Sequence, residues 1–202
     1  MSLNLPPLPP VAGEPAGPSV VDVVSREHRE LIALCDELTG DGTDAARRRT
    51  LAQVVSAELS RHLSAEEQYL YPAVRAAVPD GYALIDREID EDRALLEALR
   101  LLEAAEDGDD RAARADDVRR RLARHADAAD GELLPLLRRM ASDEDLVRLG
   151  NRVELAEEAA PTRPHPGTPA APPWNKIVDP AVALTDKIRD VVSGRTTYRR
   201  DL

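Results

Sequence analysis

Two segments of the chain repeat one arrangement of a histidine, downstream carboxylates and a proline. His62 begins the run His-Leu-Ser-Ala-Glu-Glu-Gln-Tyr-Leu-Tyr-Pro and His125 begins His-Ala-Asp-Ala-Ala-Asp-Gly-Glu-Leu-Leu-Pro, so each histidine precedes a proline by ten residues. His62 and Glu66 are four residues apart, and on an α-helix they project from one face within roughly 6 Å. Asp130 follows His125 by five residues, a looser fit to a straight helix. Because imidazole and carboxylate suit divalent iron, manganese and zinc, the repeat predicts two halves of a metal site.

The helices that must position these groups are predicted from the spacing of apolar residues and from turn signals. Four long helices are expected over residues 20–38, 43–78, 82–105 and 111–140, with Thr43 as a cap, a kink at Pro72 and Pro135 near the last end. A shorter fifth helix is expected from a cap at Ser142 to about Glu158. Long helices with short connections predict an all-α, up-down-up-down four-helix bundle.

Ionisable residues replace apolar ones along the inward-facing seam of each long helix. His28 takes a seam position in the first helix, and Glu88 and Asp92 take two in the third. Burying several unpaired carboxylates would cost several kcal/mol each, so a cation is expected among them. The competing interpretations are a hydrogen-bonded core histidine for His28 and a solvated acidic face for Glu88 and Asp92, as expected for their neighbours Asp90 and Glu91.

Length and composition divide the chain into a helical domain and two appendages. The 202 residues suit one domain, which we place at 20–159, after a Pro-rich leader at 1–19. Residues 160–202 form a Pro-rich linker and a basic amphipathic tail, with seven Lys or Arg against four Asp or Glu in 161–202. The tail docks on the acidic bundle, stays solvated, or packs on a second subunit as a homodimer, and the sequence leaves these alternatives open.

Charge, hydropathy and cysteine content exclude several classes of protein. A net charge of −11 argues against nucleic acid as the partner. Apolar runs are far shorter than the ~20 residues that span a bilayer, and the leader lacks the basic and apolar regions of a signal peptide. The single cysteine, Cys35, excludes an intrachain disulfide and suits a reducing compartment. We therefore expect a cytoplasmic protein with no membrane partner.

Over about residues 20–140 these motifs resemble the hemerythrin family, also called the HHE cation-binding domain. The matching parts are His28-Arg-Glu-Leu-Ile, His62-x3-Glu66-Glu67-x3-Tyr71-Pro72 and His125-x4-Asp130-x4-Pro135. In that family a four-helix bundle holds two non-haem irons, bridged by carboxylates from the second and fourth helices. The resemblance implies that Glu66 and Asp130 are the bridges. It implies that His28 and His62 bind one metal and that His125 binds the other.

The third helix departs from the family pattern. Oxygen-carrying hemerythrins have two histidines four residues apart there, whereas this chain has Glu88 and Asp92 at that spacing. The complete expected ligand set is His28, His62, Glu66, Glu88, Asp92, His125 and Asp130. The expected cofactor is iron, two ions per chain, with zinc or manganese as alternatives.

Two additional carboxylates favour ferric over ferrous iron and lower the redox potential. This argues against reversible O₂ carriage and favours reaction with O₂ or H₂O₂, including catalase-like removal of peroxide in oxidative stress. Tyr69 and Tyr71 are candidate hydrogen-bond donors to the site, and Tyr71 is equally interpreted as a packing residue. The alternatives are a protein that senses or stores O₂ or iron without catalysis, and a structural site for a single metal or zinc. Whether the chain is an enzyme is left open.

Overall fold

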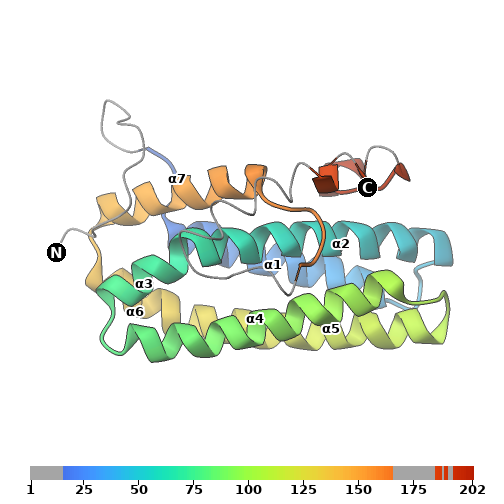
Figure 1. Ribbon diagram of the computed structural model, residues 1–202, viewed down its shortest axis with the longest axis horizontal. Helices are drawn as coiled ribbons and strands as arrows, with labels where there is room; N and C mark the ends of the chain where they lie inside the picture. The colour runs from blue at the N-terminus through green and yellow to red at the C-terminus, as the bar shows by residue number, and fades with distance from the viewer. Residues whose placement is uncertain (1–15, 166–184, 188, 191–192) are drawn as a thin grey trace.

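Four long antiparallel helices form the body of the structure (Figure 1). The structure is a computed structural model that describes residues 16–165, 185–187, 189–190 and 193–202. The long helices are α1 (Val20–Thr39), α2 (Ala45–Ala65), α4 (Gly81–Ala104) and α5 (Asp109–Ala128). α1 packs on α2 and α5, and α4 packs on the same two helices, which closes the bundle. The predicted all-α, four-helix architecture is confirmed.

The second and fourth predicted helices are each interrupted where a proline approaches. α2 passes through a π-helical turn, η1 (Glu66–Leu70), into α3 (Tyr71–Ala77). α5 passes through the equivalent turn, η2 (Ala129–Leu133), into α6 (Leu134–Met140). Proline has no N–H group and its ring clashes with the carbonyl four residues earlier, so the helix before it adjusts. A widened turn gives that relief at both positions and keeps the chain helical.

Helix starts follow capping chemistry, with one correction to the expected bounds. Ser19 caps α1 by accepting a hydrogen bond from the Asp22 amide. Asp44, and not Thr43, caps α2, since its carboxylate accepts from the Arg47 amide at 2.9 Å. A carboxylate next to the helix start satisfies a free amide and also favours the positive end of the helix dipole. The Thr43 hydroxyl instead donates to the carbonyl of Glu37.

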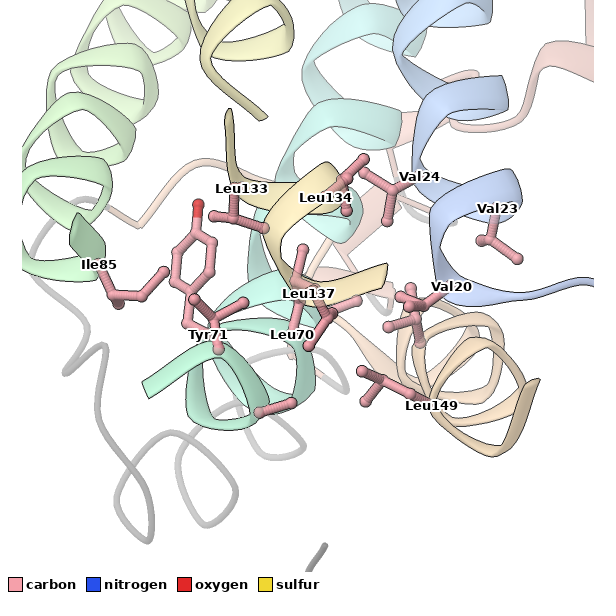
Figure 2. Packing of buried hydrophobic residues seen from close by; sticks show 14 of the residues in the cluster. Val20, Val23, Val24, Leu70, Tyr71, Ile85, Leu133, Leu134, Leu137 and Leu149 are labelled. Carbon is pink, nitrogen blue, oxygen red and sulfur yellow. The ribbon is translucent and has the colours of Figure 1, made fainter. Parts of the chain in front are cut away.

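The hydrophobic core consists of two clusters separated along the bundle by a polar layer. Figure 2 shows the first cluster, in which Val20 and Val24 of α1 lie on the same side as Leu134 and Leu137 of α6. The second cluster occupies the other end of the bundle and contains Leu31, Leu59, Leu99 and Leu122. Buried ionisable residues lie between the clusters: His28 on α1, Asp92 on α4 and His125 on α5. The seam positions identified in the sequence thus lie at one level of the bundle.

The fifth helix, α7 (Asp143–Ala159), covers the groove between α1 and α2, and Ser142 caps it as predicted. Gly150 allows α7 to approach closely, because a Cβ atom there would lie 2.6 Å from the Pro18 carbonyl oxygen. No helix in the described part of the chain is long and apolar enough to span a membrane.

The C-terminal segment, defined here as residues 193–202, lies against its own bundle (Figure 1). Arg195 pairs with Glu103 of α4, and the Thr196 amide donates to the Gln53 side chain at 3.3 Å. Leu202 packs on the second hydrophobic cluster. The apolar residues on which the amphipathic tail prediction rested, Val182, Ile188, Val191 and Val192, lie outside the described residues, and a homodimer through the tail stays a prediction.

Replacing Gly150 with alanine should destabilise the protein by about 1–3 kcal/mol, because the methyl group would force α7 away from the start of α1. Thermal unfolding followed by circular dichroism measures the change. The matched control is Gly131→Ala in η2, where an added Cβ meets nothing within 4 Å and a neutral or slightly stabilising effect is expected. Equal melting temperatures for Gly150→Ala and the parent would contradict the close approach.

Candidate metal centre

Three histidines surround one carboxylate in the polar layer. The Nε2 atoms of His125, His62 and His28 lie 3.2, 3.6 and 3.9 Å from the nearest carboxylate oxygen of Glu66. One ligand atom from each of these four buried residues lies within 4.8 Å of the others. His28 comes from α1, His62 and Glu66 from the end of α2 and the start of η1, and His125 from α5. Three separate helices therefore direct their donors at one point.

Each imidazole has a carboxylate against its other nitrogen, Nδ1. The pairs are His28 with Asp130 at 3.5 Å, His62 with Glu27 at 3.0 Å and His125 with Asp92 at 3.1 Å. A carboxylate at Nδ1 fixes the ring orientation and makes Nε2 more basic, which is the usual arrangement behind a metal-bound histidine. His62–Glu27 is a hydrogen bond, whereas the other two pairs are ion-pair contacts, since Nδ1 of His28 and Nδ1 of His125 have no hydrogen-bond partner in the described part of the chain. In all three rings Nε2 is the nitrogen that faces Glu66.

The donor atoms fit a cation. In the part of the chain that the structure describes, Nε2 of all three histidines and Oε1 of Glu66 are buried and have no hydrogen-bond partner. Leaving several such atoms unsatisfied costs about 1–3 kcal/mol each, and one cation among them would satisfy them together. Three imidazoles and one carboxylate form a set that iron, zinc and manganese accept.

Tyr71 closes one side of the centre. Its hydroxyl donates to Oδ2 of Asp92 at 2.6 Å and lies 3.2 Å from Oε2 of Glu66. The π-turn explains this position, because the Tyr71 amide bonds the Glu66 carbonyl and brings residues five apart onto one side. Its ring stands between Ile85 and Leu133 in the first hydrophobic cluster (Figure 2). Tyr71 is thus both a packing residue and a polar contact of the site.

The remaining predicted ligands lie at the margin. Asp130 is partly exposed, accepts a hydrogen bond from Ser25 at 2.6 Å, and has its pKa lowered by the neighbouring His28. Glu88 is buried beside Arg87, at 3.4 Å, and burial raises its pKa. Of the expected seven, the structure gathers His28, His62, Glu66 and His125 at one point, places Asp92 and Asp130 behind two of the histidines, and sets Glu88 apart.

Two contacts of the centre were not predicted from the sequence. Glu27 precedes His28 on α1 and pairs with His62 across the helix interface. Glu157 of α7 places Oε1 3.9 Å from the same His62 nitrogen. Sequence spacing relates residues within one helix, so a contact between side chains of different helices leaves no regular signal in it.

Interactions among the ionisable side chains decide which residues of the centre carry a proton. Burial opposes charge on His125, but Glu66 and Asp92 outweigh it and raise its pKa to about 10. The pKa of His62 is likewise raised well above its ordinary value, where Glu66 overcomes burial. Burial lowers the pKa of His28 to about 4, and the neighbouring imidazoles lower that of Glu66 to about 2 against the effect of burial. A metal ion must therefore displace protons from His62 and His125.

Comparison with known proteins finds a family whose members share this sequence pattern. The family model of the hemerythrin HHE cation-binding domain matches residues 15–137. An uncharacterized hemerythrin-like protein of Schizosaccharomyces pombe is 23% identical over 175 residues, which cover 86% of this chain and 86% of that protein. No solved structure matches the chain.

The metal-free protein should become less stable as the pH rises from about 7 to about 9. The His125 pKa is near 6.5 in the unfolded chain and about 10 in the folded one. Its stabilising proton is therefore fully present below the unfolded value and is lost on the way to the folded one. Urea unfolding in the presence of a chelator measures the slope. Asp92→Asn removes one of the anions responsible and should flatten it, and a stability independent of pH in the parent would contradict the assignment.

Proposed function

The chain belongs to the hemerythrin HHE cation-binding family, and we propose that it binds iron and reacts with O₂ or H₂O₂. The observation that carries the proposal is the convergence of three imidazole Nε2 atoms on the buried Glu66 carboxylate. Family membership supports non-haem metal binding, and the unsatisfied buried donors support it independently. The proposal concerns the identity of the metal and its reactivity.

The distances favour one metal ion per chain. Asp92 and Asp130 lie against the Nδ1 atoms, where they support histidines and do not share the central space. Tyr71 also lies between Glu66 and Asp92, so that the Asp92 carboxylate is already engaged by a hydroxyl group. Two irons per chain, the prediction from the resemblance, require Asp92 to exchange its contacts with Tyr71 and His125 for metal coordination.

Surrounding charge supports reaction over reversible O₂ carriage. Bound iron would supply one-electron redox chemistry and polarisation of an O–O bond. The carboxylates of Glu27, Asp92 and Asp130 increase the electron donation of the histidines and favour the higher oxidation state. Tyr71 holds a proton next to Glu66, within reach of a small molecule at the centre. The hydrophobic clusters on both sides restrict access of bulk water.

A sensing role is the second candidate, and one contact favours it. Arg61, the neighbour of His62 on α2, donates to the Thr197 carbonyl at 2.7 Å and lies over the Tyr198 ring at 4.5 Å. A change at His62 would in this way reach the C-terminal segment. In that case iron or O₂ binding would alter the docking of the segment without turnover.

Elemental analysis of protein purified from iron-supplemented cells should give about one iron per chain. Glu66→Gln should lose it, because a neutral amide replaces the central anion. Asp92→Asn should keep the stoichiometry and lower affinity about 10–100-fold, as expected for a residue behind a ligand. Asp90→Asn, on the exposed face of the same helix, is the matched control. Two irons in the parent and one in Asp92→Asn would restore the two-iron site.

Iron-loaded protein should convert two H₂O₂ molecules into O₂ and two water molecules faster than the same concentration of free iron. An oxygen electrode records the O₂ evolved, and Glu66→Gln treated with the same iron is the control. A rate equal to that of free iron would exclude the catalytic role. A stable, reversible oxygenated spectrum would then support the sensing role.

A further inference from the structure

We propose that a cavity of about 150 Å³ beside His62 is the route by which the metal cation reaches the centre, and that Arg199 of the C-terminal segment obstructs it. The inference rests on the proposed metal binding and adds where the ion enters. The cavity lies where α1, α2, α7 and the C-terminal segment meet.

Four carboxylates and two arginines, Arg26 and Arg199, line the cavity, and the carboxylates become less exposed toward the centre. The acidic residues that line it are Glu27, Glu30, Glu58 and Glu157. Side-chain exposure falls from 41% at Glu30 to 22% at Glu157, 13% at Glu27 and 2% at His62. His62 is the most buried of these residues. Its Nε2 faces Glu66 and has no hydrogen-bond partner in the described part of the chain. The cavity therefore ends on one of the four converging residues.

His62 has one nitrogen toward the cavity and the other toward the centre. Oε2 of Glu27 lies 3.0 Å and Oε1 of Glu157 lies 3.9 Å from Nδ1 of His62. One ligand atom from each of these three residues lies within 4.8 Å of the others. Two carboxylates and an imidazole can hold a divalent cation transiently one ring away from Glu66. Acidic walls also raise the local cation concentration and the association rate.

Part of this wall lies outside the family match. Glu157 belongs to α7, which begins at Asp143, whereas the match ends at residue 137. The C-terminal segment lies outside it as well. The matched bundle supplies most of the cavity wall, and the segments that follow it supply Glu157 and Arg199.

Arg199 places a positive charge among these carboxylates. Its Nη1 lies 2.9 Å from Oε2 of Glu30, and its backbone amide donates to Glu58 at 3.2 Å. The preceding residues are held by Arg61, through the Thr197 carbonyl and the Tyr198 ring. An incoming cation competes with this guanidinium for Glu30. The C-terminal segment thereby limits how fast the centre can be filled.

The rate of Co²⁺ uptake tests the route. Full-length protein is stripped with a chelator and mixed with Co²⁺ at several concentrations, and the visible absorption of the bound ion gives the association rate. Arg199→Ala should accelerate uptake about tenfold and Glu157→Gln should slow it about tenfold, in line with electrostatic steering. Arg200→Ala is the matched control, because Arg200 also stacks on Tyr198, at 4.4 Å, but is not part of the cavity wall.

The outcomes separate the route from the metal site. Parent-like rates in both Arg199→Ala and Glu157→Gln, with Co²⁺ still bound, would overturn the route and leave metal binding intact. Failure of the parent to bind Co²⁺ would overturn both. Should Arg199→Ala loosen the fold, as seen by circular dichroism, Arg199→Gln removes the charge at similar length. Arg199→Gln should accelerate uptake in the same direction, and an unchanged rate would count against the route.

Discussion

The contact between the buried Glu66 carboxylate and the imidazoles around it is the interaction on which the rest of the structure depends. The carboxylate is enclosed by three imidazoles from three helices, and two of them, His62 and His125, bring compensating charge to it. An isolated carboxylate in this position would cost several kcal/mol. The carboxylates at the Nδ1 atoms of His62 and His125 then balance the charge of these two histidines, while Asp130 lies beside the uncharged His28. Each charged group of the polar layer is compensated by others in the same layer, which explains why charged residues occupy seam positions on every long helix.

The two π-turns connect backbone chemistry to this layer. Each relieves a helix that meets a proline, and each contains a carboxylate residue of the polar layer. In η1, which begins at Glu66, the wider turn brings Tyr71 beside Glu66. η2 begins at Ala129 and contains Asp130, which contacts His28 and Ser25 of α1. The repeated ten-residue spacing from histidine to proline therefore determines where the π-turn forms as well as where the polar residues of the site lie.

The fold could be predicted from the sequence almost completely, because apolar periodicity and caps are properties of one helix at a time. The same reasoning identified His28, His62, Glu66 and His125, since each occupies a seam position. It did not determine which nitrogen of a histidine each carboxylate meets. Asp92 and Asp130 have the right residue type and level, yet they lie behind imidazoles. Rotamers and contacts between helices decide that detail, and so does the choice of Asp44 over Thr43 as a cap, where adjacent residues had similar propensities.

The division of the core by the polar layer also bears on how the protein unfolds. The two apolar clusters have no member in common, and between them lie groups that prefer water when they are unpaired. Cooperativity between the ends of the bundle must therefore pass through the helix backbones and the charged layer. With the layer weakened, each end becomes a unit that opens with its own free energy, and amide hydrogen exchange would then distinguish two protected regions where a continuous core would give one.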